Sequence, residues 1–480
     1  MSQQVTISLW IFVVLLLIAI LAILDRVLIP STRWLLRRRI NRVLEEIGTR
    51  LDIAIRPFQL TKRQVLIDRL VYDPRVLEAI QDHARMHDMP LAVAQKNVVT
   101  YAREIVPSFN AYLYFRIGYW IAKKIARALY RVRVGLLDET QFATVDTDST
   151  VVFVMNHRSN MDYVLVAFLA AERTTLSYAV GEWAKIWPLQ MLIRAMGAFF
   201  VRRNSGDPLY RRVLERYIHM ATREGVCQAV FLEGGLSRDG RLRKPKLGLM
   251  DYMLRNFDPG VDRDVVFIPV GINYDRTLED RSLLRELDPA ASNPGIWFVV
   301  RTTTRFVVRS LVLMAFSRWR RYGYACVNFG APLSVKAYCR ATNTDFGKLP
   351  REERFPQIEK LCRQLMDAIA DVVPILPVAL VATVFLDAAG RAMDILQIET
   401  RCSQLIQELK AHGAPVLESP RSTRTHAIAD AVDFMLLRHM LTTSGDLIEA
   451  NPREESLLRY YANAIGHWQE TSNSRYANPR

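Results

Sequence analysis

The sequence of 480 residues is 50% hydrophobic and 24% charged, and its 21 glycines and 21 prolines are an ordinary share. This composition excludes a disordered, collagen-like or disulfide-scaffold protein, and the length allows roughly two to four domains of about 100–200 residues. The 64 Lys and Arg against 49 Asp and Glu leave a net charge of +15, which favours anionic partners such as nucleic acid, anionic lipid or phosphorylated metabolites.

Residues 7–24, ISLWIFVVLLLIAILAIL, form an apolar run that no charged residue interrupts. As a helix this run would be roughly 27 Å long, close to the thickness of the hydrocarbon layer. It lacks the positive start and the cleavage site of a signal peptide, and a core helix without a polar face would be unusual. Arginines follow between residues 33 and 42. We therefore expect residues 1–30 to be a single-pass anchor in the cell membrane, the inner membrane of a bacterium, with the body of the protein in the cytoplasm.

Two later stretches combine apolar and basic residues. Residues 296–321 mix large apolar side chains with arginines spaced four apart. Residues 119–133 contain basic residues at the flanks of an apolar helical face made of Trp120, Ile121, Ile125 and Leu129. Each stretch fits either a helix packed on the protein core or a helix lying in the membrane interface.

The middle of the chain differs from its two flanks in the pattern of apolar residues. Residues 31–145 and 336–480 contain long stretches typical of helices. Residues 146–335 instead contain short apolar, β-branched runs, separated by helix-like stretches, at 151–155, 229–233 and 265–272. Strands that alternate with helices predict an α/β domain with a mixed or parallel sheet flanked by helices. Pro269, inside the third run, predicts a strand at an edge or a bulge.

The first of these runs leads into residues with acid–base chemistry. In VVFVMNHRSNMDYVLV, residues 151–166, His157 follows the expected strand and Asp162 comes five residues later. Positions five apart do not share a face of one helix, but they can meet across a turn from a strand to a helix. An imidazole beside a carboxylate is a general base with a fixed tautomer, suited to deprotonating an alcohol.

Two basic segments follow. GAFFVRR, residues 197–203, ends in Arg202 and Arg203, whose fork geometry suits a phosphate, although a solvated pair would look the same. FLEGGLSRDGRLRKPKLG, residues 231–248, has a Gly-Gly turn that permits close approach to a ligand, followed by five basic residues. The spacing of a P-loop is absent, and a basic surface loop would be similar.

Together with the strand at 265–272, these runs resemble the glycerolipid acyltransferases, in particular the glycerol-3-phosphate acyltransferase family. The family shows HxxxxD, then G-x-F-F-[IV]-R-R, then F-x-E-G-x-x-S-R, then a strand with an internal proline, and this chain has all four in that order. HRSxMDY and GAFFVRR are closer to the glycerol-3-phosphate branch than to the lysophosphatidate branch. The resemblance covers about residues 100–335 and implies an acyltransferase-like α/β fold for residues 146–335.

The resemblance also implies roles for individual residues. His157 is the base that deprotonates the acceptor hydroxyl, and Asp162 orients it. The alkoxide then attacks an acyl thioester of coenzyme A or acyl carrier protein, with Gly234 and neighbouring backbone N–H groups near the acceptor or the oxyanion. The residues expected to bind substrate are Arg158, Ser159, Arg202, Arg203, Glu233, Gly234, Gly235, Ser237, Arg238 and Lys246, among which Arg202, Arg203 and Arg238 hold the phosphate.

One position departs from the family pattern. Leu236 stands where the family has an arginine before the serine of the third motif. Arg238, Arg241 or Lys246 could substitute, or the acceptor could be another hydroxyl compound. The main expectation is therefore acylation of glycerol 3-phosphate at the start of phospholipid synthesis. The alternatives are acylation of lysophosphatidate or another lysolipid, and a non-enzymatic lipid-binding scaffold.

The remaining expectations concern cofactors and partners. The five cysteines form no CxxC and no His-Cys cluster, so we expect free thiols and no metal site. No resident cofactor is expected, because the acyl thioester is a co-substrate. The expected partners are membrane lipids, the acyl donor and the phosphorylated acceptor, and no nucleic acid is expected.

Overall fold

The computed structural model describes residues 56–135, 142, 144–170, 175–181, 189–202, 205–287, 322–417 and 421–469. The expected anchor at 7–24 and the basic stretch at 296–321 lie outside these residues. Within the described ranges, no helix is both long enough and apolar enough to span a bilayer.

Short helices form the N-terminal part of the described chain. They are α3 (Pro57–Leu60), α4 (Arg63–Val71), α5 (Pro74–Met86) and α6 (Leu91–Ile105), followed by the π-helical turn η2 (Leu113–Gly118) and α7 (Tyr119–Leu129). Prolines begin two of them: Pro57 and Pro74 occupy the first turns of α3 and α5, where a missing N–H costs nothing. The Asp73 side chain caps α5 by accepting from the Arg75 N–H.

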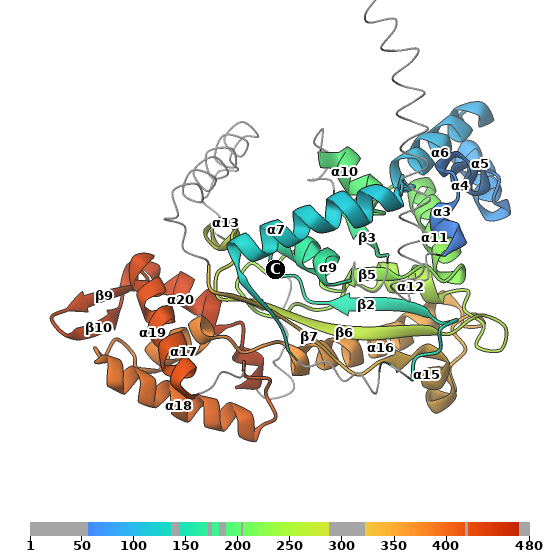
Figure 1. Cartoon of the computed structure of the whole chain (residues 1–480). Helices are drawn as coiled ribbons and strands as arrows, with labels where there is room; N and C mark the ends of the chain where they lie inside the picture. Colours follow the sequence, from blue (N-terminus) through green and yellow to red (C-terminus); the bar gives the residue numbers. More distant parts are fainter. Residues whose placement is uncertain are drawn as a thin grey trace, which may run out of the picture.

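An eight-stranded mixed sheet forms the centre of the molecule (Figure 1), in the order β1-β7-β6-β2-β5-β3-β4, with β8 beside β6. The strands are β1 (Arg131–Val134), β2 (Thr150–Met155), β3 (Ser177–Val180), β4 (Phe199–Phe200), β5 (Gln228–Phe231), β6 (Val265–Tyr274), β7 (Tyr324–Phe329) and β8 (Leu333–Ser334). β2 is parallel to β5 and β6, whereas β7 and β8 are antiparallel to β6. The predicted mixed sheet of an α/β fold is confirmed, and its three apolar runs are β2, β5 and β6.

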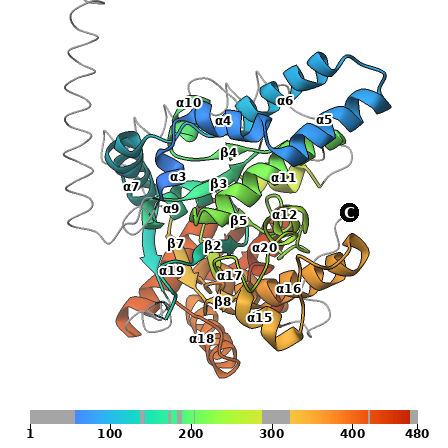
Figure 2. The same cartoon turned by 90° about the vertical axis from the view of Figure 1, so that its right-hand side faces the viewer.

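Helices cover both faces of the sheet (Figure 2). The bounds of the helices are α9 (Met161–Ala170), α10 (Leu189–Ala195), α11 (Pro208–Arg223), α12 (Gly248–Leu254), α13 (Asp280–Arg285), α15 (Val335–Thr342) and α16 (Arg351–Val372). Because side chains alternate along a strand, Val152 and Val154 of β2 face the core beneath α11, α12 and α16, while Met155 faces the core beneath α9. The α/β fold extends beyond the range 146–335 expected from the sequence: it includes β1 before residue 146 and α16 after residue 335.

Of the edge or bulge expected at Pro269, the edge is excluded, because β6 is an internal strand. β6 pairs with β2 on one side and with β8 and then β7 on the other. On that second side, pairing with β8 ends at Phe267 and pairing with β7 starts at Val270. The Pro269 carbonyl accepts from the Gly330 N–H on this side, so the nitrogen without a proton faces the gap between β8 and β7. The proline therefore removes no ladder hydrogen bond.

The C-terminal part packs around a core of its own beyond the carboxyl ends of β2 and β6 (Figure 1). It consists of α17 (Pro377–Asp387), α18 (Ile395–Ala411), α19 (Arg421–Leu437), the hairpin β9 (Leu441–Ser444) and β10 (Leu447–Ala450), and α20 (Glu455–Ala462). The apolar residues of α17 are buried all round, which makes it the central helix of this unit.

Candidate active site

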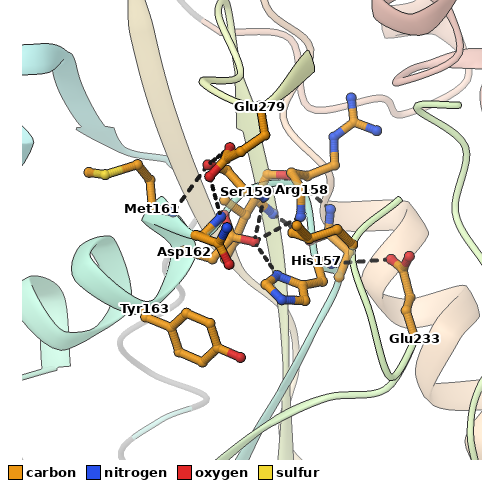
Figure 3. Close-up of polar contacts among 12 residues, drawn as sticks. His157, Arg158, Ser159, Met161, Asp162, Tyr163, Glu233 and Glu279 are labelled. Atoms are coloured by element: carbon orange, nitrogen blue, oxygen red, sulfur yellow. Dashed lines mark hydrogen bonds and ion pairs between the residues drawn. The ribbon is translucent and has the colours of Figure 1, made fainter. Parts of the chain in front are cut away.

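The carboxyl ends of three neighbouring strands bring the predicted site residues to one edge of the sheet. β2 ends two residues before His157, β5 ends two residues before Glu233, and β6 ends at Tyr274. Because β2 lies between β5 and β6 and is parallel to both, these ends meet at the edge where α/β proteins bind ligands. Figure 3 shows the His157 ring there, with Asp162 on one side and Glu233 on the other.

His157 and Asp162 form a buried hydrogen-bonded pair. Nδ1 of His157 donates to Oδ2 of Asp162 over 2.8 Å, and the two side chains are 2% and 0% exposed. With its proton on Nδ1, the ring carries its lone pair on Nε2. Nε2 has no hydrogen-bond partner among the described residues, so it is positioned to accept a proton.

The Asp162 carboxylate accepts four hydrogen bonds. Oδ2 takes the N–H groups of Arg158 (2.8 Å) and Ser159 (3.1 Å) besides the imidazole, and Oδ1 takes the hydroxyl of Tyr274 (2.6 Å). Every partner is a donor, as an ionised carboxylate requires. The Tyr274 hydroxyl cannot readily ionise, because burial, and then the charge and hydrogen bond of Asp162, raise its pKa well above the ordinary value.

Two further side chains shape the loop between β2 and α9. The Asn156 amide bonds both backbone groups of Ile272 on β6, donating over 2.9 Å and accepting over 2.8 Å. The Glu279 carboxylate accepts from the Ser159 hydroxyl (2.7 Å) and from the Asn160 N–H (3.2 Å). The loop is therefore tied to the strand on one side and to the start of α13 on the other.

Aromatic rings set the plane of the imidazole. Phe231 stacks on His157 with ring centroids 3.9 Å apart, and Tyr163 meets it edge-on at 5.5 Å. These contacts keep water from the ring faces, so the charge interaction with Asp162 is screened less than it would be in solution.

The Glu233 carboxyl lies beside the His157 backbone. Its Oε1 accepts from the His157 N–H over 3.3 Å, and its buried Oε2 has no partner among the described residues. Burial raises the pKa of Glu233 to about 8, against the opposing effects of the His157 N–H and the charges of Arg158 and Arg243. Near neutral pH the group is therefore largely protonated.

The loop after β5 packs directly against the histidine. The Ser237 N–H donates to the His157 carbonyl over 2.9 Å, and the Ser237 hydroxyl donates to the Arg241 carbonyl over 2.6 Å. Gly234 has φ +66°, and a Cβ there would lie 2.7 Å from the side chain of Lys246. Its N–H already donates to the Phe231 carbonyl, whereas the N–H of buried Gly235 has no partner in the described part of the chain.

The arginines expected to bind the phosphate, and Arg158, which was expected to bind substrate, have different partners in the structure. Arg202 forms two hydrogen bonds with the Glu104 carboxylate (3.0 and 2.6 Å), and Arg238 forms an exposed ion pair with Glu286 (3.1 Å). Arg158 is buried, donates to the Gly240 carbonyl and lies over the Tyr460 ring, 5.4 Å from its centroid. Arg203 lies outside the described residues.

Sequence reasoning missed Tyr274 and Glu279. Tyr274 ends the strand that carries the fourth motif, so the rule that parallel strand ends meet could have identified it. Glu279 lies in a loop with no motif, 119 residues from Asn160, and the sequence carries no signal for that contact.

Comparisons with known proteins match most of the chain. Residues 138–273 match the family described as acyltransferase, and residues 310–469 match the family described as glycerol-3-phosphate acyltransferase C-terminal region. Curated glycerol-3-phosphate acyltransferases of Xanthomonas axonopodis pv. citri and Actinobacillus succinogenes are 28% and 27% identical to it, covering 92% and 85% of this chain. The shares of those relatives that are covered are 49% and 50%, so the chain spans about half the length of the curated relatives it matches.

One solved structure is also similar. The crystal structure of the 1-acyl-sn-glycerophosphate acyltransferase PlsC from Thermotoga maritima aligns with a TM-score of 0.30 and 16% identity, covering 64% of this chain and 96% of that chain.

Proposed function

Because this chain belongs to the glycerol-3-phosphate acyltransferase family of the glycerolipid acyltransferases, we propose that it transfers a fatty acyl group to the sn-1 hydroxyl of glycerol 3-phosphate. The product is lysophosphatidate, at the start of phospholipid synthesis. The observation that carries this proposal is the His157 imidazole, held by Asp162 at the carboxyl edge of the sheet, with no hydrogen-bond partner for Nε2 among the residues that the structure describes.

The proposed reaction is a direct transfer without an acyl-enzyme. Nε2 of His157 takes the proton of the acceptor hydroxyl as the hydroxyl oxygen attacks the thioester carbonyl, and Asp162 stabilises the imidazolium that forms. The carbon–sulfur bond then breaks, and the thiolate leaves and takes the proton from the imidazolium. The Gly235 N–H is the donor that we assign to the developing oxyanion, since the Gly234 N–H is already used.

The remaining parts of the proposal concern location and partners. Residues 7–24 anchor the chain in the membrane of a bacterium, and the site faces the cytoplasm, where acyl coenzyme A or acyl carrier protein is available. No resident cofactor is needed, because the thioester is itself activated. The acceptor lies against the loop at 233–246, with Arg238 and Lys246 at its exposed rim.

An assay of the full chain in membranes tests the proposal. One labelled acyl donor is offered with glycerol 3-phosphate, dihydroxyacetone phosphate or lysophosphatidate in parallel. We expect labelled lysophosphatidate from glycerol 3-phosphate, and we expect His157→Ala to abolish it, by roughly 10³-fold or more, because the base is lost. His87→Ala, which removes an exposed histidine of the N-terminal helices, is the control and should retain activity.

Two results would contradict this proposal. Activity of His157→Ala close to that of the parent would show that the base is wrongly assigned. Acylation of lysophosphatidate alone would favour the lysolipid acyltransferase instead, the alternative that Leu236 supports.

A further inference from the structure

The cations near the site differ in whether a carboxylate already neutralises them. Arg202 is paired with Glu104, and Arg238 is paired with Glu286. The buried guanidinium of Arg158 donates to Gly240 and lies over Tyr460, so it faces the C-terminal unit. None of these three offers an uncommitted fork to a phosphate.

At position 236, where the family has arginine, this chain has a leucine that makes a packing contact. The Leu236 side chain is half-buried and packs against the apolar core of the C-terminal helices. A guanidinium from this position would have to leave that contact. Leu236 therefore contributes packing rather than charge.

Arg243 reaches the same place from the other end of the loop. Its guanidinium donates from one NH₂ group to the backbone carbonyl of Leu236 over 3.2 Å. Within the described residues, no carboxylate lies within ion-pair distance of it, and this single bond leaves the other N–H groups of the fork available.

The charge of Arg243 also reaches the catalytic edge. It is one of the two arginines whose charge acts on the Glu233 carboxyl, the other being Arg158. Glu233 in turn contacts the backbone of His157. Arg243 is thus the half-buried cation that lies near the histidine and has no carboxylate partner in the described part of the loop.

We propose that Arg243 is the phosphate-binding residue of this site, replacing the arginine that position 236 lacks, and that the acceptor therefore carries a phosphate monoester. This inference rests on the proposed function and deepens it. A fork held at one corner by the Leu236 carbonyl can present its remaining N–H groups to the phosphate oxygens. The hydroxyl to be acylated then lies toward His157.

The test compares Arg243→Leu and Arg243→Lys with the parent chain in detergent micelles. Arg243→Leu should raise the KM for glycerol 3-phosphate by roughly 10- to 100-fold, the size of a lost charge-assisted contact, with kcat and the KM for the acyl donor nearly unchanged. Arg243→Lys should give an intermediate KM, because it keeps the charge and loses the fork. Arg340→Leu, an exposed charge change on α15, is the control and should alter neither constant.

A binding measurement separates this inference from the proposed function. Calorimetric titration with glycerol 3-phosphate should detect binding to the parent chain and a matching loss of affinity in Arg243→Leu, whether or not the parent transfers an acyl group. A parent that binds but does not acylate would overturn the function and leave the role of Arg243 supported. An unchanged KM and affinity for glycerol 3-phosphate in Arg243→Leu would overturn the role of Arg243. A fall in kcat with the KM values of both substrates unchanged would overturn it as well. Thermal unfolding of each variant identifies any that is misfolded. If Arg243→Leu is misfolded, Arg243→Lys still provides a decisive test.

Discussion

At the scale of single residues, the site is organised around carboxyl groups in different environments. Asp162 is surrounded by donors, whereas Glu233 is buried with one oxygen unpartnered, and burial raises its pKa to about 8. Burial also raises the pKa of Glu279, against its hydrogen bonds from Ser159 and Asn160. The carboxyl groups thus differ in their hydrogen-bond environment, since Asp162 has a donor at each oxygen and Glu233 has one at a single oxygen.

The raised pKa of Glu233 makes a prediction about stability and pH. Between about pH 4.5 and 8 the folded state holds a proton that the unfolded state has released, so the free energy of unfolding falls as pH rises, by at most about 1.4 kcal/mol per pH unit. Glu233→Gln cannot titrate. The melting temperature of this variant minus that of the parent should therefore increase from pH 5 to pH 8 and remain constant above pH 8. If the melting temperatures of the two proteins instead changed in parallel with pH across this range, Glu233 would titrate normally.

At the scale of elements, the position of the site depends on how β6 meets α16. Gly271 of β6 lies so close to the end of α16 that a Cβ would be 2.4 Å from the Val372 carbonyl oxygen and 2.6 Å from the Val373 nitrogen. Both are backbone atoms, so no side-chain rotation can make room. The glycine is what allows this helix to pack on the strand that supplies Tyr274.

Gly271→Ala should therefore destabilise the protein and reduce its activity. We expect a loss of about 1–3 kcal/mol, the usual cost of overpacking a core, seen as a lower midpoint of urea unfolding. The acyl-transfer rate should fall as well, because β6 must move away from α16. Gly248→Ala is the matched control, since a Cβ there meets nothing within 4 Å, and it should unfold at the parent's midpoint or above. Equal midpoints for Gly271→Ala and the parent would mean that the helix end shifts freely.

The elements also show which features a sequence can predict. β2, β5 and β6 were predictable because internal strands need continuous apolar runs, and His157 with Asp162 because both belong to one turn. The pairing of Arg202 with Glu104 was not, since 98 residues separate them and only the packing of α6 beside β4 unites them. Pro269 predicted an edge or a bulge, and the structure places it at a break in pairing within an internal strand, because the gap between β8 and β7 depends on a strand order that the sequence does not show.

At the scale of the whole molecule, the C-terminal helices are joined by hydrogen bonds to the loop that carries His157 and Asp162. Arg438, which directly follows α19, and Tyr461 of α20 both donate to the buried Asp280 carboxylate at the start of α13. The preceding residue, Glu279, holds Ser159 and Asn160. The C-terminal unit thus contributes to the geometry of the site through two adjacent acidic residues.

The outer face of α7 leads to a prediction about membrane contact. Ala122, Ala126 and Leu129 are buried beneath the helix, so Leu129 does not share one face with the exposed Trp120 and Ile125, whereas the sequence pattern predicted that it would. Trp120 and Ile125 are 58% and 39% exposed, beside the exposed Lys124 and Arg127. An exposed Trp with neighbouring cations is typical of a helix that lies in the interface of an anionic membrane. α7 lies on the same side of the sheet as α9, the helix that follows His157 (Figure 1).

A chain lacking residues 1–30 should therefore shift toward the soluble fraction and yet still float with anionic vesicles. Each basic residue near such a surface contributes about 1 kcal/mol, so this binding should weaken as salt rises. Replacing both Trp120 and Ile125 by Ser should lower vesicle affinity roughly tenfold or more, because their apolar area no longer leaves water. The control replaces Leu396 and Leu437, exposed leucines of the C-terminal helices, by Ser and should float like the truncated parent. Equal flotation of the α7 double variant and the truncated parent would place the lipid contact on another surface.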